Sequence, residues 1–180
     1  LAAGPFTKPI AATAGLDLPL STGRGQKLVY HNAPMVPQDA PMVIDEETGA
    51  HWRPALDGAF LLHTDADEPE SPAADPVAID HGLHRRLIDP DSPVSICHVT
   101  PFWERAWTDG SLEWEIVAGQ YTMTPDHRPL IGASGVEGLW LNCGYSGHGV
   151  MGSPAGSRLL IDIICGQESG EGNPLDPHRE

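Results

Sequence analysis

The chain has 180 residues, of which 40% are hydrophobic, so it is long and apolar enough to bury the core of one good-sized domain. Its 25 acidic and 10 basic residues give a formal net charge of −15, which would repel a phosphate backbone and argues against nucleic acid as a partner. No run of residues approaches the roughly 18 to 20 apolar residues that a membrane-spanning helix needs. The start, Leu1–Pro5, lacks the basic flank of a signal peptide, so we expect no membrane anchor.

Three cysteines, Cys97, Cys143 and Cys165, are odd in number and widely spaced, with no Cys-x-x-Cys pair. This pattern argues against a zinc ribbon and against a disulfide framework. We therefore expect three free thiols in a reducing compartment, and a cytoplasmic location.

The first elements in chain order are a short helix and a strand. Residues 9–16 predict a helix that ends at Gly15. Residues 18–32 carry the strand-like run 26–30 after two turn-forming glycines, Gly23 and Gly25. A strand that enters a new layer of the fold is the expected structure.

Three short apolar runs follow, and short polar turns separate them. The turns are residues 46–49 and the pair Asp57-Gly58, and the runs are residues 42–45, 50–53 and 59–63. Such spacing is typical of an antiparallel meander.

The middle of the chain predicts an exposed loop, a helix and a strand pair. Residues 64–75 contain five acidic residues and two prolines, which favours an exposed loop with little structure of its own. Residues 77–88 have helical spacing through Ile79, Leu83 and Leu87. Residues 92–117 interleave tryptophans with charges around an Asp109-Gly110 turn, and we interpret them as a strand pair, with the tryptophans in the core and in subunit contacts.

The last third of the chain predicts a strand, a glycine loop and a helix. Residues 139–143 are typical of a buried strand, and residues 154–165 of an apolar helix that stops at Gly166. Beyond Gln167 the sequence is polar, and we expect a frayed tail.

The glycine loop, Gly144-Tyr145-Ser146-Gly147-His148-Gly149, lets a flat or charged ligand approach the backbone closely. The helix that follows it adds unpaired amides and a partial positive charge, which suit an anionic oxygen. Its order, Gly-x-x-Gly-x-Gly, is the reverse of the dinucleotide fingerprint, and no phosphate-loop lysine follows. By itself the loop is equally compatible with a tight strand-to-helix connection that binds no ligand.

Three stretches in fixed order, residues 119–132, 138–140 and 144–149, closely resemble the C-terminal signature of the D-amino-acid-oxidase-like (DAO) family of FAD oxidoreductases. That family includes glycine oxidase, sarcosine oxidase and dimethylglycine dehydrogenase. The resemblance implies an α+β fold in which an antiparallel substrate-domain sheet joins the C-terminal strand and helix of a Rossmann-like FAD-binding domain. The N-terminal half of that domain, which carries the pyrophosphate site, is absent from this sequence.

The same resemblance divides the chain. It implies that residues 1–17 end the N-terminal half of the FAD-binding domain and that residues 18–118 form the substrate-binding domain. Residues 119–168 would return to the FAD-binding domain, and residues 169–180 form a polar tail. The missing half, or other subunits, are therefore expected partners. Without that half we expect this chain alone not to hold FAD tightly and to be inactive.

By resemblance, the loop and the start of the next helix lie along the flavin, and a helix N-terminus stabilises the negative charge of the reduced ring. The implied FAD-binding residues are Ala3, Gly4, Gly144, Tyr145, Ser146, Gly147, His148, Gly149, Val150 and Met151. At Gly119, where monomeric sarcosine oxidases carry a cysteine bonded to the flavin, glycine cannot form that bond, so non-covalent FAD is expected at this site.

Tyr121, His148 and Arg53 are the implied catalytic residues. Tyr121 stands where glycine oxidase carries an arginine that binds the substrate carboxylate, and tyrosine cannot make that bidentate contact. The chain is therefore more similar to the sarcosine-oxidase-beta-like and dehydrogenase-beta-like branches of the family. Met151, however, replaces a lysine of the sarcosine oxidases, which puts sarcosine itself in doubt as the substrate. Arg53 is the first candidate for the carboxylate and Arg24 the second; a surface ion pair is the alternative for either.

The implied reaction is hydride transfer from the carbon next to an amine to flavin N5, which gives an imine, with an amino acid or an N-methylated amino acid as the substrate. Two alternatives stay open: a non-catalytic substrate-domain piece or interaction subunit, and a metal-binding protein that uses His81 and His84. The metal hypothesis lacks a third ligand at a known spacing, so we expect no metal. Asp126 is expected to cap the turn that begins at Thr124 rather than to take part in catalysis.

Overall fold

The computed structural model describes residues 1–55, 57–64 and 69–179, and the chain forms two compact units. The first unit comprises residues 1–24, 69–75 and 120–180, and the second comprises residues 25–68 and 76–119. Two long strands, β1 (Ser21–His31) and β5 (Glu113–Met123), contribute residues to both units. Each unit has its own buried apolar cluster, and mixed helices and antiparallel strands confirm the coarse α+β expectation.

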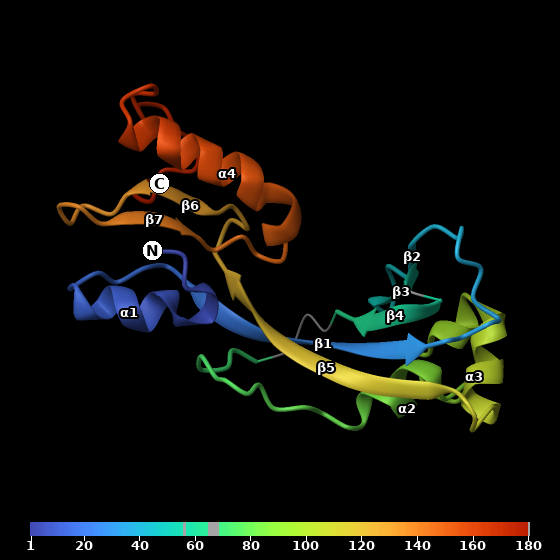
Figure 1. Ribbon diagram of the computed structural model, residues 1–180. Helices are drawn as coiled ribbons and strands as arrows, with labels where there is room; N and C mark the ends of the chain where they lie inside the picture. The colour runs from blue at the N-terminus through green and yellow to red at the C-terminus, as the bar shows by residue number, and fades with distance from the viewer. Residues whose placement is uncertain (56, 65–68, 180) are drawn as a thin grey trace. The chain divides into compact units, whose positions relative to one another are not determined.

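The first unit places a two-stranded antiparallel sheet between two helices (Figure 1). The strands are β6 (Leu130–Ala133) and β7 (Trp140–Cys143), and the helices are α1 (Thr7–Thr13), which follows the short helix η1 (Gly4–Phe6), and α4 (Gly149–Ile164). Because successive side chains of a strand point to opposite faces, the two faces have different partners. Those on one face form the first core: Leu130, Leu141 and Cys143 lie with Ala11, Leu18 and Leu20.

Helix α4 begins at Gly149, five residues earlier than the predicted Pro154, which lies inside the helix. A proline is tolerated most easily in the first turn, which is why it indicated a later start. The extra turn forms because the His148 carbonyl accepts hydrogen bonds from the amides of Met151 and Gly152, at 3.2 and 2.8 Å. The predicted stop is confirmed, since Gly166 has a left-handed φ of +69°.

The C-terminal residues are bound to β6, so the prediction of a frayed tail was wrong. The Ile131 amide donates to the Leu175 carbonyl at 2.7 Å, and the Asn173 side-chain amide donates to the Ile131 carbonyl at 2.7 Å. Polar residues stabilise the turns of the tail, because Asp176 accepts a hydrogen bond from the His178 amide at 2.7 Å. The polar composition therefore serves local turns rather than disorder.

The second unit contains a five-stranded sheet in the order β2-β3-β4-β1-β5. Antiparallel pairing of β2 with β3, β3 with β4 and β4 with β1 confirms the predicted meander; β2, β3 and β4 are Val43–Ile44, Ala50–Ala55 and Gly58–His63. Gly58 is required by space, since a Cβ there would collide with the Tyr30 carbonyl oxygen. Gly23 and Gly25 lie inside β1 and form no turn.

Helices cover the rest of the second unit: α2 (Leu83–Ile88), η2 (Ile96–His98), η3 (Pro101–Trp103) and α3 (Glu104–Thr108). The predicted helix over residues 77–88 forms only from Leu83, because the Asp80 side chain accepts the Gly82 amide at 2.8 Å in a local turn that competes with a helix. The predicted strand pair over residues 92–117 was wrong, since only β5 is a strand there. The short helices form instead because Ser95 caps η2 and Pro101 starts η3.

Aromatic side chains fill the second core. Trp103 is fully buried and lies 5.5 Å from Tyr30 and 5.7 Å from Trp52 between ring centroids. Trp107 and Trp114 are about two-fifths exposed and stack on His84 at the edge of this core. The prediction that tryptophans lie in the core is therefore confirmed for Trp52 and Trp103.

Part of the acidic segment over residues 64–75 is hydrogen-bonded to β1. Residues 65–68 lie outside the described residues. Beyond them the backbone of Glu70 forms an isolated antiparallel β-bridge with Gly23 in β1, and the Ser71 amide donates to the Thr22 carbonyl at 2.8 Å. No helix in the described part of the chain combines the length and apolar character needed to cross a membrane.

Candidate functional site

The glycine loop connects β7 to α4 in a run of left-handed backbone conformations. Gly144, Ser146 and Gly147 have φ values of +73°, +49° and +87°. Glycine adopts this region without steric cost, but Ser146 has to be held there. The Ser146 amide donates to the Thr122 carbonyl at 3.0 Å, and its hydroxyl oxygen accepts from the Thr124 amide at 3.1 Å.

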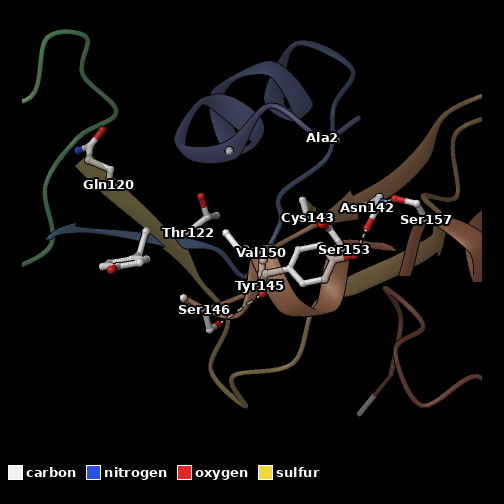
Figure 2. A pocket seen from close by; sticks show the side chains of 15 residues that line it. Ala2, Gln120, Thr122, Asn142, Cys143, Tyr145, Ser146, Val150, Ser153 and Ser157 are labelled. Atoms are coloured by element: carbon white, nitrogen blue, oxygen red, sulfur yellow. Dashed lines mark hydrogen bonds between the residues drawn. The ribbon is translucent and has the colours of Figure 1, made fainter. Parts of the chain in front are cut away.

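A cleft of about 470 Å³ opens beside this loop within the first unit (Figure 2). Its wall combines the start of the chain, the end of β5, the loop and the first turns of α4. The residues that line it include Ala2, Gly4, Gln120, Tyr121, Thr122, Asn142, Gly144, Tyr145, Ser146, Gly147, Gly149, Val150 and Ser157. The cleft is thus lined both by the exposed backbone of the glycine loop and by polar and apolar side chains.

The N-terminus of α4 presents unpaired donors to this cleft. Within the part of the chain that the structure describes, the amides of Gly149 and Val150 donate to no protein oxygen, and no side chain caps the helix at His148. The Val150 side chain beside them is 95% exposed. Two free amides, a helix dipole and an apolar contact therefore point to a flat ligand with an electron-rich edge.

Tyr145 forms a fixed wall of the cleft. Its hydroxyl donates to Asn142 Oδ1 at 2.5 Å, and Asn142 Nδ2 donates to Ser157 Oγ at 3.1 Å. Burial raises the pKa of Tyr145, which keeps the phenol protonated as a donor. A Cβ at Gly156 would collide with the same hydroxyl, so that glycine lets α4 approach the ring.

The cleft brings together most of the sequence-predicted residues of the first unit. Those that line it are Gly4, Tyr121, Gly144, Tyr145, Ser146, Gly147, Gly149 and Val150. Ala3, His148 and Met151 are not among its lining residues, and the His148 and Met151 side chains are exposed to solvent. Ala2, adjacent to Ala3, lines the cleft instead.

The remaining predicted residues lie on the long strands and the meander. Arg53 lies in β3 of the second unit, where its exposed guanidinium stacks over the Phe60 ring at 4.7 Å. Arg24 lies in β1 and Gly119 in β5. Their roles stay predictions.

One motif escaped the sequence interpretation. Residues 147–152, Gly-His-Gly-Val-Met-Gly, have the Gly-x-Gly-x-x-Gly spacing and lie between a strand and a helix. With Gly144 taken as the first glycine of the loop, this spacing is not apparent. No strand follows α4 in the described part of the chain, so the motif is not in a βαβ unit. Its third glycine, Gly152, faces the Tyr145 ring, where a Cβ would come within 3.2 Å.

Metal chemistry finds no support in the described residues, which contain no group of three or more His, Cys, Asp or Glu side chains able to hold an ion. His84 instead bonds to Tyr30, with Nε2 lying 2.9 Å from the phenol oxygen. The three cysteines are free thiols.

Comparison with known proteins identifies the family. A family model described as FAD dependent oxidoreductase matches residues 1–163. Glycine oxidase from Pseudomonas putida is 27% identical over 172 residues, which is 93% of this chain and 41% of that protein. The chain therefore spans less than half the length of this relative.

Solved structures show the same fold. L-proline dehydrogenase from P. horikoshii superposes with a TM-score of 0.71 at 24% identity, over 99% of this chain and 45% of that one. Glycine oxidase from Geobacillus kaustophilus superposes with a TM-score of 0.69 at 19% identity, over 99% of this chain and 44% of that one. With the family model covering most of the chain, these findings establish that the protein belongs to the DAO family of FAD dependent oxidoreductases.

Proposed function

We propose that this chain forms the flavin-facing part of an enzyme that oxidises the C–N bond of an amino acid or an N-methylated amino acid. The observation that carries this proposal is the pair of unpaired amides at Gly149 and Val150, which open with the glycine loop onto one cleft in a member of an FAD-dependent family.

The residues of the cleft fit a flavin. An isoalloxazine ring carries acceptors at N1 and at the C2 carbonyl, and both become more negative on reduction, so they match two amides at a helix N-terminus. Gly147 has no side chain to block the approach of a flat ring, and Val150 and Tyr121 offer apolar contact. When bound, FAD supplies the hydride acceptor, at N5. We propose non-covalent FAD at the position of Gly119, which has no thiol.

The chain's own residues would orient the substrate and keep water out. Tyr121 lines the cleft with a half-exposed ring, and Tyr145 forms its fixed wall. The exposed guanidinium of Arg53 remains our first candidate for the substrate carboxylate, and Arg24 our second. His148, exposed at the start of α4, is proposed to lie beside the ring.

The test is anaerobic titration of the complete FAD-loaded enzyme, in which this chain is joined to the N-terminal half of the FAD-binding domain, with sarcosine, dimethylglycine, proline and D-amino acids. We expect at least one of them to bleach the flavin absorbance, because hydride transfer reduces the ring without an external acceptor. FAD binding with no bleaching by any of these compounds would favour the non-catalytic alternative.

A further inference from the structure

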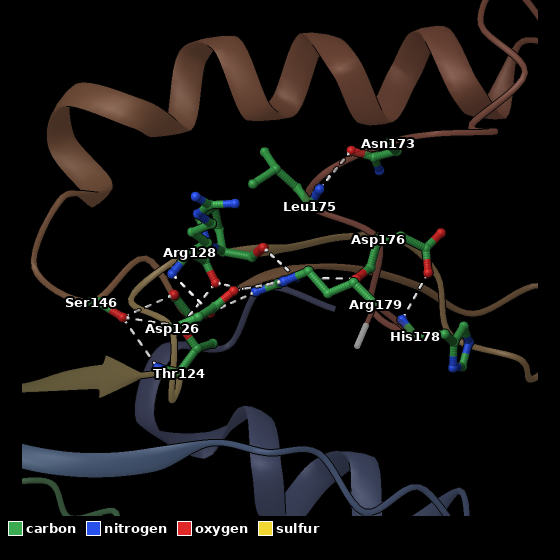
Figure 3. Close-up of polar contacts among 11 residues, drawn as sticks. Thr124, Asp126, Arg128, Ser146, Asn173, Leu175, Asp176, His178 and Arg179 are labelled. Atoms are coloured by element: carbon green, nitrogen blue, oxygen red, sulfur yellow. Dashed lines mark hydrogen bonds and ion pairs between the residues drawn. The ribbon is translucent and has the colours of Figure 1, made fainter.

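The last residues of the chain form an ordered segment, residues 173–179, which we call the C-terminal strap. It uses both backbone groups of Ile131 in β6, through Leu175 and Asn173. Figure 3 shows the strap from Asn173 to Arg179, with Arg179 against Asp126. The sheet is adapted to this contact, since Gly132 has a φ of +148° and a Cβ there would come within 3.0 Å of Pro177. The strap is therefore part of the folded first unit.

Arg179 ends the strap in a fully used hydrogen-bonding site. Its Nε and Nη2 donate to the two carboxylate oxygens of Asp126, each at 2.9 Å. Nη2 also donates to the Arg128 carbonyl at 2.7 Å, and Nη1 donates to the carbonyls of Pro129 and Asp176 at 3.0 and 3.1 Å. The Arg179 side chain is only 16% exposed. A bidentate pair of this kind fixes geometry as well as charge.

The turn that Arg179 holds is bonded to the glycine loop. The Arg128 carbonyl also accepts from the Thr124 hydroxyl at 2.8 Å. The Thr124 amide in turn donates to the Ser146 hydroxyl oxygen at 3.1 Å, and both residues are buried. The partners of Arg179 are thus two hydrogen bonds away from the one non-glycine residue of the loop that is held at positive φ.

We propose that Arg179 is a positioning residue, which reaches back 53 residues to Asp126 and fixes, through Arg128 and Thr124, the conformation of the glycine loop. Ser146 occupies a backbone region that L-residues disfavour, so its conformation depends on these bonds. The consequence for a flavin, namely that the loop amides stay aligned, rests on the proposed function. The mechanical link itself does not.

The test is hydrogen–deuterium exchange of the purified chain without added flavin. In Arg179→Ala, we expect the hydrogen-bonded loop amides of Ser146 and His148 to exchange about tenfold faster or more, because charge-assisted bonds that hold the turn are lost. Arg158→Ala is the matched control, since Arg158 bonds to Asp162 on α4 at 2.8 and 2.9 Å and is 74% exposed. The control should leave the loop unchanged.

Asp126→Asn provides a milder variant should Arg179→Ala not fold. In the wild type, Asp126 Oδ1 accepts from the Arg128 amide at 3.1 Å. The variant keeps this oxygen acceptor but removes the charge that pairs with Arg179. We expect faster exchange in the same loop peptides, by a smaller factor. The proposal is overturned if either variant speeds exchange only in the strap and in residues 126–129, or uniformly across all peptides including β3 and β4.

FAD affinity, measured on the complete enzyme with its N-terminal half, separates this inference from the proposed function. We expect Arg179→Ala to weaken FAD binding by about tenfold while Arg158→Ala does not, on the scale of a charge-assisted contact. If the complete wild-type enzyme binds no FAD but the loop exchange of this chain still responds to Arg179, the positioning role holds and the proposed function fails. If FAD binds and bleaches but loop exchange and affinity ignore Arg179, the positioning role fails alone.

Discussion

His84 is held as a neutral base between a buried phenol and two exposed indoles. Its Nε2 lies 2.9 Å from the Tyr30 hydroxyl, and its ring stacks on Trp114 at 4.2 Å and on Trp107 at 6.1 Å. Burial lowers the pKa of His84 below its ordinary value of 6.5, and burial also raises the pKa of Tyr30, which therefore stays a donor. Because burial penalises the charged form, this arrangement favours the uncharged imidazole.

Stability should consequently depend on pH through His84. Below pH 6.5 the unfolded chain takes up a proton at His84 while the folded protein does not, until its lowered pKa is reached. We expect the free energy of unfolding to fall as the pH drops from about 7 towards 5, and to fall less in His84→Gln. Urea unfolding at several pH values measures this.

The control for that measurement is His81→Gln, because His81 is an exposed turn residue two positions before α2. It should retain the wild-type slope between pH 7 and 5. Equal slopes for the wild type and His84→Gln would show that His84 does not contribute.

At the scale of elements, the first turn of α4 carries two large apolar side chains that pack against little of the described chain. Val150 is 95% exposed and Met151 is 74% exposed, although both are large and apolar. Helix N-termini favour negative charge, so an acidic residue there is tolerated by the folded chain. The same charge would oppose an electron-rich flavin edge.

Val150→Asp should therefore separate stability from binding. We expect the free energy of unfolding to stay within about 0.5 kcal/mol of the wild type, because Val150 makes little contact and the dipole favours the carboxylate. FAD affinity of the complete enzyme should fall by about tenfold or more, on the scale of one charged contact. Fluorescence titration with FAD measures the affinity and urea unfolding the stability.

Val136→Asp supplies the comparison, since Val136 is an exposed loop residue outside the cleft. It should bind FAD as the wild type does. Unchanged affinity in Val150→Asp would mean that the α4 N-terminus does not face the cofactor.

At the scale of the whole molecule, the chain has two hydrophobic cores that share no residue. The first gathers residues of α1, β6 and β7, and the second gathers residues of the meander, β1 and the short helices. The spectroscopic probes of unfolding are also divided between the two units. Four of the five tryptophans lie in the second unit, whereas the longest helix, α4, lies in the first.

Gly156→Ala should reveal this division. Its Cβ would collide with the Tyr145 hydroxyl and crowd Ile131 at 2.8 Å, and overpacking of this kind costs about 1–3 kcal/mol. We expect the helical circular dichroism transition to move to lower urea concentration, while tryptophan fluorescence moves less. Gly23→Ala is the control, because no atom lies within 4 Å of its Cβ. Transitions that shift together would indicate a single cooperative unit.

Local patterns predicted much of the candidate site. The glycines and the flanking strand and helix located the loop, because left-handed turns require residues without side chains. The Asp126 turn was confirmed, since its carboxylate accepts the Arg128 amide at 3.1 Å. Ser157 and Arg179 were missed because each acts through a partner 15 or more residues away, which no periodicity reveals. Asn142 was missed because the sequence pattern of its strand does not show which of its side chains bonds to Tyr145.

The sequence by itself determined the family, the antiparallel meander and the glycine loop, since these depend on alternation, turn chemistry and motif order. Only the tertiary structure decided that residues 96–108 are helical, where Trp103 is buried against Tyr30, that α4 starts at Gly149, and that the polar tail is bound to β6. For Trp103 and for the tail, the physical reason is contact between residues distant in the chain, which outweighs weak local propensities. Hydrogen bonds at His148 and Ser95, by contrast, set where α4 and η2 begin.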